Sequence, residues 1–263
     1  MAIPSFGFTP PFNTSGKTLY LYAENLHKRF VLHHQGGIEL TVFQGISLGL
    51  YRGEAVALYG ASGSGKSTLM RSLYGNYRIN QGQIWIQHRD CWCNLPDLFP
   101  HELIKIRQTT LGYVSQFLRV IPRVPALEVV ADPLLQLGVA PDLARSKAKQ
   151  LLDRLNIPDR LWTLSPTTFS GGEKQRINLA RSFMVDYPIL LLDEPTAALD
   201  AINRAIVVEM LLERKKQGTA ILGIFHDDDA RKQICDSVLE VMPTYPGAIY
   251  PGELPVPFDP KIK

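Results

Sequence analysis

The stretch Gly60-Ala61-Ser62-Gly63-Ser64-Gly65-Lys66-Ser67 decides the fold of this chain. It matches the pattern G-x-x-x-x-G-K-[ST], in which a glycine-rich loop holds phosphate groups between a strand and a helix. Glu54 to Tyr59 before it predicts a short buried strand, and Ser67 to Tyr74 after it predicts the start of a helix. The segment therefore has the order that a phosphate-binding loop requires.

Each part of this loop has a physical reason to bind a nucleoside triphosphate. Glycines let successive N–H groups point at phosphate oxygens, and the following helix adds the positive end of its dipole. We expect Lys66 to reach the β and γ phosphates and Ser67 to offer its hydroxyl to Mg²⁺. A Gly/Ser-rich turn could match by chance, but the flanking strand and helix favour a nucleotide site. The predicted nucleotide-binding residues here are Gly60, Ala61, Ser62, Gly63, Ser64, Gly65, Lys66, Ser67 and Thr68.

Two carboxylates follow a second apolar run, Ile189 to Leu192. Asp193 ends this predicted strand, where the Walker B pattern places a Mg²⁺ ligand. Glu194 comes next and could polarise a water molecule in line with the γ phosphate. Either carboxylate could instead cap the next helix, but both match the pattern at once.

The rest of the chain alternates apolar runs with helical spacing, which indicates an α/β layer structure. Residues Leu118 to Thr168 differ, because they show helical spacing throughout and predict a helical subdomain. The further strand candidates are Gln83 to Ile86, Leu111 to Val114 and Ala220 to Ile224, and the candidate helices of the subdomain are Ala126 to Leu137 and Pro141 to Leu155.

The composition limits the classes of partner that we expect, but it does not indicate a function. The chain has 263 residues, and 28 Lys and Arg balance 25 Asp and Glu, so no strong field indicates nucleic acid as a partner. Its longest apolar runs fall far short of the roughly 20 residues that span a bilayer, so we expect no membrane segment in the chain itself. Met1 to Gly16 does not resemble a secretory signal, which makes cytoplasmic residence the expectation.

Three cysteines, an odd number, predict no disulfide framework. Cys91 and Cys93 lie near His88 and His101 in the sequence, which raises the question of a metal site. Their spacing matches none of the usual zinc patterns, so reduced thiols on a strand or turn are the favoured interpretation.

The run Phe169-Ser170-Gly171-Gly172-Glu173-Lys174-Gln175-Arg176 resembles the signature motif of ATP-binding cassette (ABC) proteins, with Glu173 where Gln is commoner. The resemblance implies that Ser170, Gly171 and Gly172 close over the γ phosphate of an ATP held by an opposite cassette. Other family positions follow in order. They are Phe30 for stacking on adenine, Gln116 as the Q-loop glutamine and a Mg²⁺ ligand, Asp200 in the D-loop sequence Ala198-Leu199-Asp200, and His226 as the switch histidine.

The resemblance covers about Leu19 to Met242 and implies an α/β, ABC-type P-loop NTPase fold. We expect a RecA-like core with a mixed sheet, an antiparallel β arm and a helical subdomain at 117–170, all within a cassette of residues 18–242. Residues 1–17 and 243–263 are Pro-rich and are expected to be tails. The implied cofactors are ATP and Mg²⁺, and the implied catalytic residues are Lys66, Gln116, Glu194 and His226.

A single cassette would carry an incomplete site, because the family uses the phosphate loop of one chain with the signature motif of another. The expected partner is a second cassette, either an identical chain or a related ABC subunit.

Several blocks resemble more closely the L subunits of the bacterial carbon–phosphorus lyase system, the longest being Ile106 to Arg123. That resemblance implies a role in phosphonate breakdown, in which a phosphonate replaces adenine to give a ribose 1-phosphonate 5-triphosphate. We expect an ATP-driven subunit that remodels soluble lyase subunits.

Two other functions share these motifs. The main alternative is the ATPase subunit of a membrane transporter, and the other is a regulatory module with negligible hydrolysis, against which Glu194 and His226 argue. The segment Phe117 to Val130 should separate the lyase function from the transporter function, because it mixes apolar residues with Arg119 and Arg123 as a docking face would. The apolar members, Phe117, Leu118, Val120 and Ile121, could equally be core of the helical subdomain.

Overall fold

The computed structural model describes residues 16–32, 34, 36–116, 118 and 122–242, together with the backbone of 256 and 257. Nearly all of the two predicted tails lies outside the described residues. So do four members of the predicted docking face, Phe117, Arg119, Val120 and Ile121. The proposed domain boundaries therefore remain predictions.

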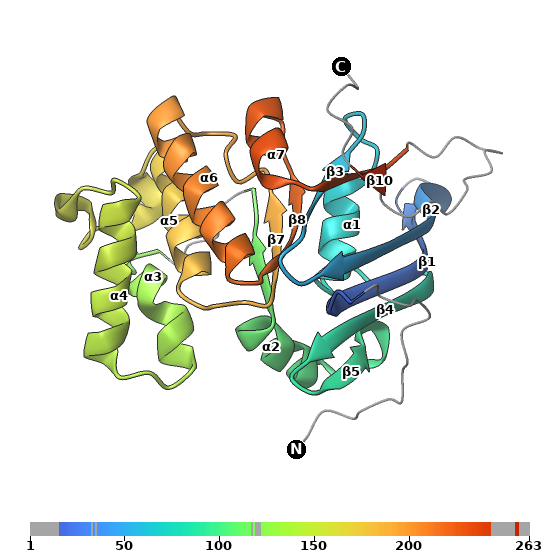
Figure 1. Cartoon of the computed structure of the whole chain (residues 1–263), viewed down its shortest axis with the longest axis horizontal. Helices are drawn as coiled ribbons and strands as arrows, with labels where there is room; N and C mark the ends of the chain where they lie inside the picture. The colour runs from blue at the N-terminus through green and yellow to red at the C-terminus, as the bar shows by residue number, and fades with distance from the viewer. Residues whose placement is uncertain are drawn as a thin grey trace.

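An antiparallel sheet forms one side of the molecule (Figure 1), with strand order β2-β1-β4-β5. Its two long strands run beside each other, and from the sequence they were expected only as a β arm. The strands are β1 (Leu19–Leu32), β2 (Ile38–Tyr51), β4 (Gln81–His88) and β5 (Cys91–Asn94).

The central sheet has the order β10-β9-β3-β8-β7-β6, and all its neighbours pair in parallel except β10, which runs antiparallel to β9. It is the mixed sheet expected from the sequence. The strands are β3 (Ala55–Tyr59), β6 (Leu111–Val114), β7 (Ile189–Asp193), β8 (Ala220–Ile224), β9 (Ser237–Glu240) and β10 (Val256–Pro257). The predictions for β3, β4, β6, β7 and β8 are confirmed.

Both faces of the central sheet are covered, which explains why its strands read as continuous apolar runs. Successive residues of β7 alternate between two hydrophobic cores. Ile189 and Leu191 join the core that contains α1 and the antiparallel sheet, whereas Leu190 and Leu192 join the core under the helical subdomain. The central sheet thus separates the two halves of the molecule.

Helix α1 (Lys66–Leu73) lies between the two sheets, whereas α3 to α7 lie on the opposite side of the central sheet (Figure 1). The predicted subdomain helices are confirmed as α3 (Ala126–Gln136) and α4 (Pro141–Arg154). The remaining α-helices are α2 (Pro100–Thr109), α5 (Gly171–Phe183), α6 (Ala201–Lys216) and α7 (Asp228–Ile234), and short 3₁₀ turns occur at Leu95–Asp97, Asp159–Leu161 and Pro166–Thr168.

Part of the predicted docking face is buried. Ala126 and Val130 are fully buried in the core of the subdomain, and Leu118 packs against that core. Arg123 is exposed. Burial between helices therefore accounts for the apolar character of Ala126 and Val130. Leu118 is only partly buried, so the docking interpretation of this segment stays a prediction.

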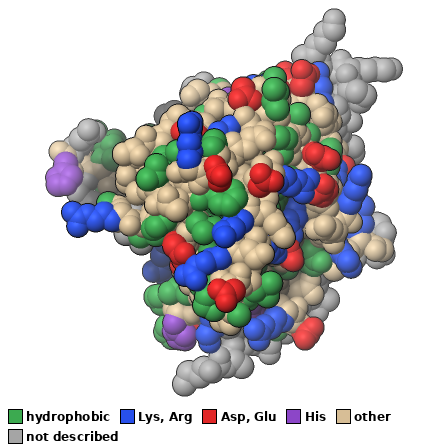
Figure 2. Space-filling view, turned by 90° about the vertical axis from the view of Figure 1, so that its left-hand side faces the viewer, with side chains coloured by type: hydrophobic (Ala, Val, Ile, Leu, Met, Phe, Trp, Pro, Cys, Tyr) green, Lys and Arg blue, Asp and Glu red, His purple; other side chains and the backbone are tan. Residues whose placement is uncertain are grey.

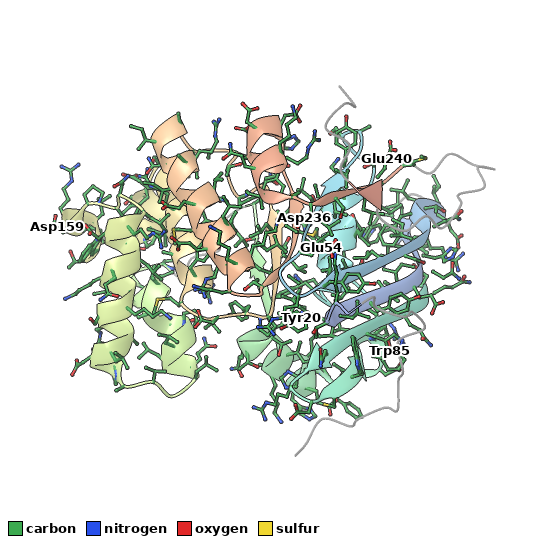
Figure 3. All side chains as sticks on the ribbon, viewed as in Figure 1. Tyr20, Glu54, Trp85, Asp159, Asp236 and Glu240 are labelled. Carbon is green, nitrogen blue, oxygen red and sulfur yellow. The ribbon has the colours of Figure 1, made fainter. Side chains whose placement is uncertain are left out.

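The start of β3, and with it the loop that follows, is anchored by a carboxylate. Asp236 accepts a hydrogen bond from the backbone N–H of Ala55 at 2.9 Å and one from Lys215 Nζ on α6 at 2.6 Å. Figure 3 labels Asp236 beside Glu54, the residue before β3. One side chain thus joins β3, β9 and α6 at the end of the sheet remote from the loop.

Cys91 and Cys93 lie on β5 and Cys235 is buried, and all three are free thiols. Burial raises the pKa of Cys93 to about 12, which makes it unreactive at neutral pH. Among the described residues, no group of three or more His, Cys, Asp or Glu side chains could hold a metal ion.

Figure 2 shows the face formed by the helical subdomain, where basic and acidic side chains are interspersed with hydrophobic ones. On this face no single sign of charge dominates, in line with the balanced composition. Within the described part of the chain, no helix combines the length and apolar character needed to cross a bilayer.

Candidate nucleotide site

The loop between β3 and α1 is shaped by glycines that no other residue could replace without strain. Gly60 has φ 143°, and a Cβ built there would lie 2.3 Å from the carbonyl oxygen of Val241. Gly65 has φ 98°, and its Cβ would lie 2.7 Å from Val42 Cγ1. The backbone at both positions is therefore packed too tightly for a side chain.

The polar groups of this loop are arranged as an anion would require. Helix α1 begins at Lys66, and Gly65 provides no side-chain cap, so the first N–H groups of the helix lack an intrahelical partner. Ser64 is 1% exposed, and its hydroxyl has no hydrogen-bond partner among the described residues. An orphaned buried hydroxyl beside an uncapped helix N-terminus fits a bound triphosphate.

Lys66 folds back over the loop, where Nζ donates hydrogen bonds to the carbonyl oxygens of Gly60 and Ala61, both at 2.8 Å. Burial lowers its pKa, and the nearby Glu194 carboxylate opposes that effect. Its ammonium group thus lies directly above the loop, close to the catalytic carboxylate predicted from the sequence.

Asp193 is 1% exposed and is held by two hydroxyl donors. Ser67 Oγ donates to Oδ1 at 3.1 Å, and the phenol of Tyr113 donates to Oδ2 at 3.0 Å. Burial raises the pKa of Asp193, and these two hydrogen bonds act in the opposite direction. A hydroxyl and a carboxylate side by side are oxygen donors of the kind that Mg²⁺ prefers, so this pair fits the metal predicted here.

Glu194 lies one residue further along, with φ 55°, an uncommon conformation for a residue other than glycine. Its Oε1 lies 2.7 Å from His226 Nε2, and Gln116 Nε2 donates to its Oε2 at 3.0 Å. The structure therefore brings together three residues that are far apart in the sequence. Strained backbone of this kind is often found at functional sites.

The signature stretch begins α5. Ser170 caps this helix, and Glu173 reaches back to accept hydrogen bonds from the Ser170 hydroxyl at 2.7 Å and backbone N–H at 2.8 Å. These bonds lower the pKa of Glu173. Gly171 faces open space, whereas a Cβ on Gly172 would lie 2.8 Å from the carbonyl oxygen of Ala198. The signature turn thus packs against the stretch that leads to Asp200, which caps α6.

The signature turn and the phosphate loop lie on opposite faces of the central sheet, since α5 packs into one core and α1 into the other. None of the contacts recorded for the described residues joins Ser170 to Lys66. The phosphate loop and the signature turn of one chain therefore lie apart and do not form a single site within that chain.

Two polar residues of α5 that have no role in the prediction from the sequence connect this helix to the site. Gln175 Nε2 donates to the carbonyl oxygen of Pro195 at 3.2 Å, and Asn178 Nδ2 donates to that of Ser115 at 2.6 Å. Both side chains are nearly fully buried. Their sequence signal is weak, because polar residues on an amphipathic helix are usually solvent-exposed.

Phe30, predicted to stack on adenine, lies near the end of β1 and packs edge-to-face on Tyr77, with ring centroids 5.4 Å apart. Lys28 Nζ lies 4.4 Å from the centroid of the Phe30 ring. Phe30 is only partly buried, and its stacking on adenine stays a prediction.

Comparison with known proteins agrees with this geometry. A family model described as "ABC transporter" matches residues 43–197. The lipoprotein-releasing system ATP-binding protein LolD of Idiomarina loihiensis is 36% identical over 203 residues, which are 77% of this chain and 87% of LolD. The macrolide export ATP-binding/permease protein MacB of Bartonella henselae is 35% identical over 221 residues, 84% of this chain but only 32% of MacB.

Solved structures show the same architecture. The dimeric structure of MJ0796, a bacterial ABC transporter cassette, superposes with a TM-score of 0.77 at 26% identity, covering 84% of this chain and 94% of that chain. A second structure of the MJ0796 cassette, dimeric in a post-hydrolysis state with ADP and Pi, gives a TM-score of 0.76 over the same shares. The fold predicted from the sequence is confirmed.

Proposed function

Because this chain belongs to the ABC transporter family of ATP-binding cassettes, we propose that it hydrolyses MgATP between two cassettes and that closure of this dimer drives a partner protein. ATP with Mg²⁺ is its cofactor. The observation that carries the proposal is the Glu194 carboxylate, held between Gln116 and His226 and adjacent to the Asp193–Ser67 pair.

Each of these residues has a distinct task in hydrolysis. Lys66 and the N–H groups at the start of α1 bind the phosphates, while Ser67, Asp193 and Gln116 are the side chains that would hold Mg²⁺. When bound, Mg²⁺ neutralises charge on the β and γ phosphates. Glu194 accepts a proton from the attacking water, and His226 fixes the orientation of the Glu194 carboxylate.

The opposite chain completes each site in this proposal. Ser170, Gly171 and Gly172 lie on the far side of the sheet from Lys66, so they can reach an ATP only on a facing cassette. An arrangement in which each chain gives the other the same residues is isologous and contains two composite sites. The dimeric cassettes similar to this chain support that arrangement.

Mixing two variants, each with a different half of the site inactivated, tests the composite site. We expect Ser170→Arg alone and Lys66→Ala alone to lose steady-state hydrolysis, because the first blocks closure and the second removes the phosphate contact. In a mixture, one site of each mixed dimer combines an intact loop with an intact signature turn, so part of the activity should return. Phosphate release from the two chains, alone and mixed, measures this.

Arg123→Ala changes an exposed residue outside the phosphate loop and the signature turn and serves as the matched control. A mixture of Arg123→Ala with Lys66→Ala should show no more hydrolysis than Arg123→Ala shows alone. Ser170→Arg should still bind ATP as a monomer. If Ser170→Arg failed to bind nucleotide, its effect would be local to one chain, and the assignment to the opposite site would be wrong.

The partner we place first is a membrane permease. The two relatives described above carry names from lipoprotein release and macrolide export. MacB is named as both ATP-binding protein and permease, and this chain spans about a third of its length. In MacB, therefore, a segment similar to this chain and a permease occur in one protein, which supports the transporter alternative over the lyase hypothesis.

The second candidate partner is a set of soluble carbon–phosphorus lyase subunits. One specific observation favours it, the resemblance of several blocks, above all Ile106 to Arg123, to the L subunits of that system. In the structure this block covers the last turn of α2, all of β6 and the stretch around Gln116. The relatives found by comparison carry transport names, so this candidate stands second.

Capture of the native partner separates the two. The tagged chain is purified from source cells grown on a phosphonate, once in buffer alone and once after solubilisation of membranes in mild detergent. We expect an integral membrane permease to co-purify only from the detergent extract, and the Glu194→Gln chain with MgATP to retain it more tightly. Lyase subunits recovered from buffer alone, with no permease in either extract, would reverse the order of the two candidates.

A further inference from the structure

Tyr113 touches the metal end of the site, although no motif points to it. It is the third residue of β6 and pairs with Leu191 on β7, two residues before Asp193. Its phenol donates to Asp193 Oδ2 at 3.0 Å, on the carboxylate oxygen that Ser67 does not contact. The two donors therefore fix both oxygens of Asp193 and leave its carboxylate one orientation.

The phenol itself is held from the side of α1. Arg71, in the last turn of α1, donates to the hydroxyl of Tyr77 at 3.2 Å, and its guanidinium interacts electrostatically with the phenol of Tyr113. An arginine can only donate hydrogen bonds, so Arg71 does not compete with Asp193 for the proton of the Tyr113 hydroxyl. The proton of the Tyr113 hydroxyl is thus directed at Asp193.

The same chain of residues continues to the predicted adenine position, because the ring of Tyr77 packs edge-to-face on Phe30. A series of aromatic, hydrogen-bond and electrostatic interactions therefore leads from Phe30 through Tyr77, Arg71 and Tyr113 to Asp193. These five residues come from β1, α1, the loop after α1, β6 and β7.

The ring of Tyr113 is fixed on its other side by stacking. It lies 4.9 Å from the ring of Tyr74 at an angle of 29°, and the guanidinium carbon of Arg107 lies 4.4 Å from the Tyr74 centroid. Arg107 is anchored in turn to the carbonyl oxygen of Tyr74 at 2.9 and 3.1 Å. The three side chains form part of the wall of a cavity of about 220 Å³ between α2, α3 and α5.

We propose that Tyr113 is a positioning residue that orients the Asp193 carboxylate for Mg²⁺ and ties that orientation, through Arg71 and Tyr77, to the adenine end of the site. The inference rests on the proposed role of Asp193 as a metal ligand. Hydrogen-bond partners of metal-ligating carboxylates determine ligand orientation, and their loss typically weakens metal binding about 10- to 100-fold.

The test replaces Tyr113 by Phe, which keeps the stacked ring and removes only the hydroxyl. Mn²⁺ is used as the probe in place of Mg²⁺, with a non-hydrolysable ATP analogue, and its binding is followed by electron paramagnetic resonance. We expect Tyr113→Phe to weaken Mn²⁺ binding about tenfold and to change the Mn²⁺ spectrum, while analogue binding in the presence of a chelator stays unchanged. Tyr187→Phe, which lines the same cavity without contacting Asp193, is the matched control.

A second variant shows whether Tyr113 acts through Asp193. In an Asp193→Asn background, Tyr113→Phe should weaken Mn²⁺ binding no further, because two residues that act as a unit are not additive. Equal Mn²⁺ affinity of Tyr113→Phe and the unaltered chain would overturn the inference, as would an undiminished effect in the Asp193→Asn background. Failure of the unaltered chain to bind the Mn²⁺–nucleotide complex would instead contradict the proposed function.

Discussion

Glu194→Gln should lower the rate of MgATP hydrolysis about 10²- to 10⁴-fold, the range that a positioned general base usually contributes. The amide has almost the shape of the carboxylate but cannot take a proton from water. Since the Glu194 side chain hydrogen-bonds to Gln116 and His226 and interacts with the loop of residues 60–67 only electrostatically, through Lys66, ATP binding should stay close to that of the unaltered chain. Single-turnover hydrolysis and equilibrium binding measure the two effects separately.

The same variant should accumulate a closed dimer, because ATP stays bound between the two cassettes. Light scattering with MgATP should report twice the mass found with ADP. Glu240→Gln, an exposed change at the end of β9 (Figure 3), serves as the control and should hydrolyse ATP normally. A monomeric Glu194→Gln chain in saturating MgATP would count against the composite site, and a normal rate of hydrolysis would remove Glu194 from catalysis.

Lys66→Ala should weaken MgATP binding on the order of 100-fold or more, the expected cost of removing one partner from a close, partly desolvated charge pair. Lys66 Nζ lies over the loop on two carbonyl oxygens, and a triphosphate would offer it stronger, charged acceptors. Among the described residues of 60–68, Lys66 is the sole cationic side chain. Isothermal calorimetry in Mg²⁺ buffer measures the loss.

Lys149→Ala on the exposed side of α4 controls for the change in net charge and should leave the affinity unaltered. The fold of Lys66→Ala should be intact, because its hydrogen bonds to Gly60 and Ala61 connect neighbours within one loop. An unchanged affinity would show that the triphosphate is bound elsewhere, and the site built on this loop would have to be abandoned.

The sequence by itself determined the local parts of the site. The loop of residues 60–67, the carboxylates after Ile189 to Leu192 and the signature turn are contiguous patterns whose chemistry depends on neighbouring residues. Four strands of the central sheet, β3, β6, β7 and β8, were also predictable, because a parallel strand buried on both faces is a continuous apolar run between turn residues. The sequence did not predict β9 and β10. The helices of the subdomain were predictable from the helical spacing of their apolar residues.

Other features depended on contacts that no local pattern encodes. Ser115 and Asn178 are 63 positions apart, yet they share a hydrogen bond, and Tyr113 reaches Asp193 across 80 positions. Burial decided that Ala126 and Val130 belong to the core, because apolar residues at helical spacing look alike whether they face a core or a partner.

Pairing between distant strands explains the difference. Parallel pairing of β6 with β7 brings Tyr113 next to the strand that ends in Asp193, and pairing of β7 with β8 brings Glu194 to His226. Register is a property of two chain segments together, so a single segment cannot reveal which side chain will lie opposite. The sequence therefore determined which chemical groups the protein carries, and the tertiary structure decided which of them meet.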